Sequence, residues 1–121
     1  MSQGPFESGI SEMIWDSRYR HRVDGVVRDQ SLEDSWQRVA HALAAVEPLD
    51  QLEWGQRFFG LLDDFRFLPG GRILAGAGTG FDVTLFNCFA MGTVEDSMEG
   101  IFDALKEGAL TMQQGGGVGY D

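Results

Sequence analysis

The distribution of glycine divides this chain into two parts of different character. Twelve of its 17 glycines lie between Gly70 and Gly119, and the first 69 residues hold the other five. Glycine at this density marks backbone that turns tightly or lies close to a ligand, and it weakens helix interiors. We therefore expect a domain boundary near residue 68, with a helical N-terminal domain over 1–68 and a different domain over 69–121.

Capping signals and apolar periodicity predict two helices in the N-terminal domain. Ser31 and Asp34 resemble a capping box that opens a helix over 31–47, and Pro48 stops it. Asp50 can cap the next helix, over 51–66, and the short link suggests an antiparallel pair. The expected apolar side of the second helix comprises Leu52, Trp54, Phe58, Leu61, Leu62 and Phe65. We assign its aromatic residues, with Trp36 of the first helix, to packing and not to a ligand.

The segment before these helices is less regular. Residues 1 to about 12 look like a loose leader, and Asp24-Gly25 has the composition of a turn. The residues between them predict either a short amphipathic helix or an irregular packed segment.

A strand and then a helix are predicted in the glycine-rich part. Residues 84–91 are rich in β-formers and barely alternate, which predicts a strand buried on both faces. Asp96-Ser97 opens a helix that ends at the glycine run Gly115 to Gly117. This is the first half of a βαβ unit, and its second strand would start near Val118. A buried strand without sheet partners leads us to expect a fragment of a longer protein.

Charge and cysteine content narrow the classes of function. The formal net charge is -10, so direct binding to nucleic acid is disfavoured. The sequence lacks a signal peptide and an apolar run that could span a membrane, so we expect a cytoplasmic protein. A basic stretch near the start is a solvated face, a contact for acidic groups elsewhere in the protein, or a nucleotide or nucleic-acid patch; it contains Arg18, Arg20, His21, Arg22 and Arg28.

Each residue that could react or bind a ligand also has a purely structural interpretation. Cys88, the only cysteine, is either a small packing residue or a reactive thiol. A zinc site is not expected, because no second cysteine is present and both histidines are distant in sequence. Asp96-Ser97 is first a helix cap, although helix amides can also bind a ligand there. The glycine segments match neither the dinucleotide fingerprint nor a P-loop.

Three segments together resemble one enzyme family. They read LPGGRILAGAGT at 68–79, LFNCFAMGTVEDSMEGIFDALKEGALTMQQGGGVGYD at 85–121 and, more weakly, SLEDSWQRVAHALA at 31–44. In these segments the chain is similar to adenosylcobalamin-dependent (class II) ribonucleotide reductases. The resemblance implies an α-rich α/β chain, in which a helical domain leads into the first strand–helix unit of a ten-stranded α/β barrel.

The resemblance also implies roles for individual residues. Cys88 is similar to one of the two cysteines that reduce the substrate and become a disulfide. Asn87, Cys88 and Gly117 match positions that contact the ribonucleotide. Asp96, Ser97 and Met98 match the helix start that binds the deoxynucleotide effector. Where many relatives carry Ser/Thr-Pro, this chain has Gly71-Arg72, so a hydroxyl contact to the substrate is not expected there.

The implied partners are a ribonucleotide substrate, a deoxynucleotide effector, a thioredoxin-type reductant and the remaining reductase polypeptide. The implied cofactor is adenosylcobalamin, with contacts expected outside this chain, and no metal ligands are expected within it. The implied enzyme is a ribonucleoside-diphosphate reductase, with diphosphate and triphosphate substrates both open. The chain alone is expected to be inactive. The alternative is a non-catalytic remnant or a module that binds another reductase chain. A truncated reading frame, a split gene and a segment before an intein all remain open as its origin.

Overall fold

The computed structural model describes residues 5–121, and the chain divides into two compact units. Residues up to Gly80 form the helical unit, and residues 81–121 form the strand–helix unit. The division lies beyond residue 68 because a helix that the sequence did not predict, α4 (Gly71–Gly76), packs with the helical unit. Leu74 and Ala77 are 7% and 2% exposed there.

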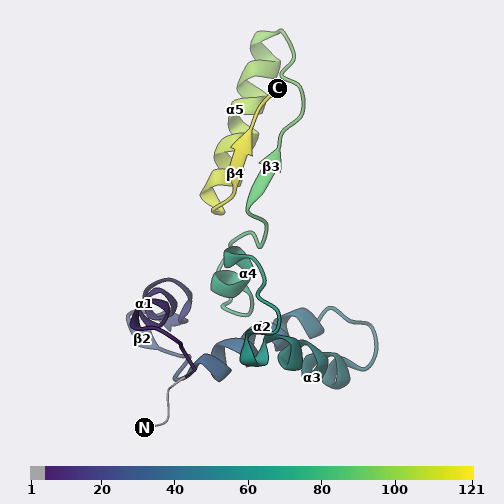
Figure 1. Cartoon of the computed structure of the whole chain (residues 1–121). Helices are drawn as coiled ribbons and strands as arrows, with labels where there is room; N and C mark the ends of the chain where they lie inside the picture. The colour runs from purple at the N-terminus through teal and green to yellow at the C-terminus, as the bar shows by residue number, and fades with distance from the viewer. Residues whose placement is uncertain (1–4) are drawn as a thin grey trace. The chain divides into compact units, whose positions relative to one another are not determined.

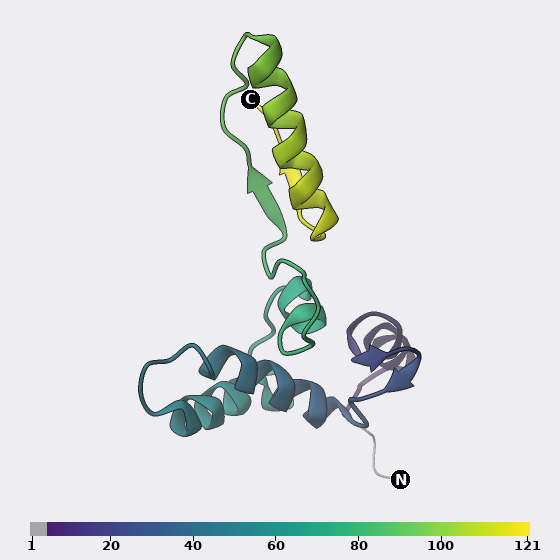
Figure 2. The same cartoon turned by 180° about the vertical axis from the view of Figure 1, so that it is seen from behind.

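Two helices form the centre of the helical unit, as predicted. They are α2 (Leu32–Ala44) and α3 (Gln51–Leu62), which lie side by side and are joined by a short loop (Figure 2). The capping box is confirmed, because the Asp34 amide donates to Ser31 Oγ at 3.2 Å and the Ser31 amide donates to Asp34 Oδ2 at 3.0 Å. Asp50 occupies the N-cap position of α3 without a side-chain capping bond, so that part of the prediction was wrong. A 3-10 turn, η2 (Asp63–Phe65), follows α3.

The core of the helical unit lies along one side of α2. Val39 is fully buried, and Trp36 is 4% exposed, which confirms its packing role. The predicted apolar side of α3 was partly wrong, because Leu52 and Leu61 are 83% and 51% exposed. The buried apolar residues of the described unit are Leu32, Trp36, Val39, Ala40, Ala44, Leu62, Leu74 and Ala77.

The N-terminal segment is more ordered than a loose leader. Helix α1 (Gly9–Ile14) begins inside the predicted leader and continues into a π-helical turn, η1 (Trp15–Tyr19); residues 1–4 lie outside the described part. A hairpin of β1 (Arg22–Val23) and β2 (Val26–Val27) follows. The predicted turn closes it, with φ of 51° at Asp24 and 79° at Gly25, as a two-residue hairpin turn requires.

The basic stretch contacts acidic groups of the same segment. Arg20 and Arg22 both form ion pairs with Asp16, at 2.8 Å and 2.6 Å. Hydrogen bonds from these two guanidinium groups lower the pKa of the Asp16 carboxyl. For these two arginines, the interpretation as a contact for acidic groups of the protein therefore holds.

The strand–helix unit is a βαβ unit. Strand β3 (Cys88–Ala90) pairs in parallel with β4 (Gly117–Gly119), and helix α5 (Met98–Gln113) connects them (Figure 1). The strand predicted over 84–91 is shorter than expected and is not buried on both faces, since Cys88 and Ala90 are exposed while Phe89 is half-buried. In the sheet of β3 and β4, only the face that carries Phe89 and Val118 is covered.

Candidate functional site

Cys88 and Gly117 lie opposite each other in the parallel sheet. They are register partners, and the Gly117 amide donates to the Asn87 carbonyl oxygen at 2.9 Å. A methyl group added at Gly117 would lie 3.8 Å from Cys88 Sγ, so the backbone of β4 runs directly beside the thiol. The structure thus brings together the three residues that the sequence assigned to the substrate.

The thiol lies on the open face of the sheet. Side chains alternate along a strand, so Phe89 and Val118, both half-buried, share one face, and Cys88 and Gly117 share the other. Cys88 is exposed and free. A small molecule can therefore reach the thiol and the adjacent glycine backbone from that face in the strand–helix unit.

The glycine run after α5 sets the position of β4. Gly115 has φ of 90°, a left-handed conformation that suits glycine at a helix end. A side chain at Gly116 would lie 2.7 Å from the Phe89 ring, so this glycine lets the returning chain pass close to β3. These two constraints place Gly117 beside Cys88.

The predicted effector residues lie at the first turn of α5. Ser97 is the N-cap and accepts a hydrogen bond from the Gly100 amide at 3.0 Å. Asp96 precedes it and Met98 begins the helix, and all three are exposed. The cap prediction is confirmed for Ser97, while the ligand role of these residues remains a prediction.

The structure does not bring the two predicted sites together. The chain leaves the Ala90 end of β3 to start α5, and α5 returns it to the Gly117 end of β4, beside Cys88 (Figure 1). A helix of this length spans about 24 Å. The first turn of α5 and the thiol therefore lie at opposite ends of the strand–helix unit.

An apolar surface of α5 is uncovered in the strand–helix unit. Gly108 is buried, and the Tyr120 hydroxyl donates to the Ala104 carbonyl at 3.2 Å, so that side of α5 contacts the β4 segment. The exposed apolar side chains of α5 are Met98, Ile101, Phe102, Leu105, Leu110 and Met112, which are 46% to 71% exposed.

The helical unit holds a polar cluster that the sequence analysis missed. Asp29 is 4% exposed and binds Arg38 and Ser35. Burial raises the pKa of Asp29, but hydrogen bonds from Arg38, Ser35 and the His21 amide outweigh it and leave the pKa lowered. The spacing of these residues along the chain gave no signal of this cluster, because it joins Asp29, before α2, to Ser35 and Arg38 within α2.

The described part of the chain, residues 5–121, shows neither a cluster of metal ligands nor a membrane-spanning helix. In that part of the chain, no three His, Cys, Asp or Glu side chains gather where they could hold a metal ion. None of its helices is long and apolar enough to cross a membrane.

Comparison with known proteins gives one consistent family. Residues 6–82 match the model of the ribonucleotide reductase all-alpha domain. A vitamin B12-dependent ribonucleoside-diphosphate reductase of Mycobacterium tuberculosis is 38% identical over 82 residues, which cover 68% of this chain and 12% of that protein. A ribonucleoside-diphosphate reductase subunit alpha of Chlamydia muridarum is 32% identical over 104 residues, covering 86% of this chain and 10% of that protein. The chain thus spans about a tenth of the length of the relatives it matches.

Proposed function

The chain belongs to the ribonucleotide reductase family, and from that membership we propose that it forms part of an enzyme that reduces ribonucleotides to deoxyribonucleotides. The observation that carries the proposal is the pairing of Cys88 with Gly117 on the open face of the β3–β4 sheet. A thiol beside a side-chain-free backbone suits a sugar that must approach closely.

The chemistry assigned to Cys88 is the reduction step. Replacing the ribose 2′-hydroxyl by hydrogen releases water and consumes two electrons and two protons. A pair of thiols supplies these and becomes a disulfide. Cys88 is one thiol of the proposed pair, and the second would come from reductase sequence that this chain does not contain. A thioredoxin-type dithiol then restores the pair by thiol–disulfide exchange.

Asn87 and Gly117 would position the substrate. The backbone carbonyl of Asn87 already accepts a hydrogen bond from the Gly117 amide. The side-chain amide of Asn87 is exposed, and it would be the group of this residue that contacts the ribonucleotide. The first turn of α5 would bind the deoxynucleotide effector through its exposed amides and the Asp96 and Ser97 side chains. Since that turn lies at the far end of the unit from Cys88, the effector would act at a distance from the reduced sugar.

Adenosylcobalamin is the proposed cofactor, by analogy with the vitamin B12-dependent relative, and it supplies the radical that starts such reactions. We expect its contacts in the nine-tenths of the relatives that the chain does not match. We also expect the other strands of the proposed ten-stranded barrel in that unmatched part. A cytoplasmic site of action suits a thiol that must be kept reduced.

A second candidate function is a non-catalytic module that binds another reductase chain. The exposed apolar surface of α5 favours it, because contiguous apolar surface of this kind marks protein contacts. Under this proposal the thiol would have no redox role.

A chimera tests the catalytic proposal. In it, this chain replaces the matching segment of the M. tuberculosis reductase. With adenosylcobalamin and a dithiol, we expect the chimera to form deoxynucleotides and the isolated chain to form none. Turnover by the isolated chain, or a folded chimera that binds substrate without turnover, would contradict the proposal.

A further inference from the structure

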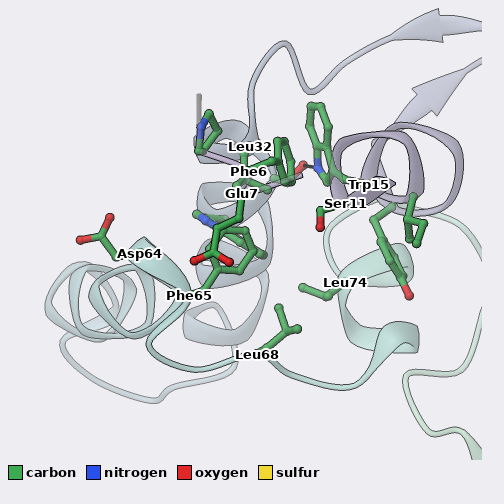
Figure 3. A pocket seen from close by; sticks show the side chains of 14 residues that line it. Phe6, Glu7, Ser11, Trp15, Leu32, Asp64, Phe65, Leu68 and Leu74 are labelled. Atoms are coloured by element: carbon green, nitrogen blue, oxygen red, sulfur yellow. Dashed lines mark hydrogen bonds between the residues drawn. The ribbon is translucent and has the colours of Figure 1, made fainter. Parts of the chain in front are cut away.

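The helical unit contains a cavity of about 610 Å³ that none of the roles above uses (Figure 3). Its walls come from η1, α2, η2, α4 and the segment before α1, with Trp15, Trp36 and Phe65 as the main aromatic surfaces. Cavities of several hundred cubic ångströms with mostly apolar walls are typical of sites for small organic molecules.

The floor of the cavity offers little to a polar ligand. The indole Nε1 of Trp15 donates to Ser35 Oγ at 3.0 Å, and Ser35 Oγ donates to Asp29 Oδ2 at 2.7 Å. These bonds use the polar hydrogens of both residues. Because most of the remaining lining is apolar, an apolar body suits the cavity.

The charge on the lining is entirely negative. Glu7 and Asp64 are its only residues charged at neutral pH, and it has no Lys, Arg or His. Within the described residues Glu7 makes no ion pair, and its exposed side chain is among those that line the cavity (Figure 3). Asp64 points away and lies 3.8 Å from Arg66. Glu7 thus provides an unpaired negative charge at an aromatic-walled opening.

The wall that carries Phe65 has an unusual backbone. Asp64 and Phe65 have φ of 54° and 55°, which is costly for a residue as bulky as phenylalanine. This conformation sets the Phe65 ring 5.5 Å from Trp36 and 6.2 Å from Phe6, centroid to centroid. Costly backbone of this kind is concentrated at ligand sites.

We propose that this cavity binds a small organic cation with an apolar body, of the class of arylalkylamines, whose amino group is protonated at neutral pH. The apolar body lies in the cavity against the Trp36 and Phe65 side chains, which are in contact with each other, and the ammonium group meets the Glu7 carboxylate, where aromatic faces also attract a cation. The proposal does not depend on the chemistry assigned to Cys88, because every residue it uses belongs to the helical unit.

The tryptophans provide the test, since Trp15 and Trp36 line the cavity and Trp54 does not. The full chain, labelled with ¹⁵N, is titrated with 2-phenylethylammonium, and the three indole N–H resonances are followed by NMR. We expect the Trp15 and Trp36 resonances to shift together and the Trp54 resonance to stay. The neutral isostere 2-phenylethanol should bind about threefold more weakly, and the anion 3-phenylpropionate more weakly still.

Charge-removing variants complete the test. Glu7→Gln should weaken binding of the amine by roughly two- to fivefold and leave binding of the alcohol unchanged. The exposed Glu33→Gln on α2, which is outside the lining, should have no effect. Equal binding of amine and alcohol, an equal shift of Trp54, or no shift of Trp15 and Trp36 with unmodified protein would each overturn the proposal. The comparison of the three probes needs no variant, so it stands even if Glu7→Gln does not fold.

Discussion

Arg38 and Asp29 form an ion pair inside the helical unit, with 3.0 Å between Nη2 and Oδ2. Their side chains are only 9% and 5% exposed. Arg38 also donates to the carbonyl oxygens of Tyr19, Leu74 and Ala77, so one guanidinium group connects η1, α2 and α4. Since these bonds connect three segments, replacing a residue of the ion pair tests how much it contributes to the stability of the helical unit.

Replacing Arg38 should strongly destabilise the helical unit. Arg38→Met leaves the Asp29 carboxylate buried without its cation and removes a donor from three carbonyl oxygens. Breaking one side of such a pair costs about 3–5 kcal/mol. Urea unfolding followed by tryptophan fluorescence measures this cost. The control is Arg57→Gln, which breaks an exposed pair with Glu53 and should cost less than about 1 kcal/mol; similar costs for both variants would contradict the expectation.

The Asp29 carboxyl should make stability depend on pH in acid. Its pKa is lowered in the folded state, so its contribution is present above the unfolded pKa of about 3.9 and is lost as pH falls through the folded value. Asp29→Asn should therefore be clearly less stable than the unmodified chain at pH 6, and the difference should shrink below about pH 4. Urea midpoints measured from pH 6 to pH 2.5 test this. A difference that is constant with pH would count against the assigned role.

Gly78 should tolerate alanine far less than Gly80 does. Both have positive φ, at 73° and 76°, so alanine costs about 1–2 kcal/mol of backbone strain at either position. At Gly78 the new methyl would also lie 2.8 Å from Arg38 Cγ and 2.9 Å from the Arg38 carbonyl oxygen, whereas Gly80 has open space. The clash should add roughly 1–3 kcal/mol for Gly78→Ala. Equal unfolding free energies for the two variants would show that the close approach is absent.

The sequence predicted best the features that depend on local signals. The capping box of Ser31 and Asp34, the Asp24-Gly25 turn and the return of the chain at Gly117 are all encoded by neighbouring residues. Helix α4 was missed because glycines flank it and its stability comes from Leu74 packing in the helical unit. The exposure of Leu52 was missed because helical periodicity does not reveal how far a partner surface extends.

Amides of the β3 region should exchange faster than those of α2. Strand β3 has one sheet partner and an open face, whereas α2 carries most of the buried apolar residues. Hydrogen exchange of the dilute chain should show lower protection over residues 85–91 than over Leu32–Ala44. Equal protection in a monomer would mean that the strand–helix unit is stable without further cover.

The candidate site could be predicted only in part from the sequence. The adjacency of Cys88 and Gly117 follows from a strand, one helix and a returning glycine loop. The Asp29–Arg38 pair and the cavity beside Trp36 join residues from several segments, so their geometry could not be deduced from spacing along the chain.

The proposed role of Cys88 as a redox thiol of a ribonucleotide reductase is tested by dithiol-driven multiple turnover in the chimera carrying Cys88→Ser. The matched control is Ala90→Ser, which adds a hydroxyl on the same exposed face of β3. We predict that Cys88→Ser abolishes multiple turnover while substrate binding persists, because half of the reducing pair is lost, and that Ala90→Ser retains it. Near-normal multiple turnover by Cys88→Ser would contradict the account.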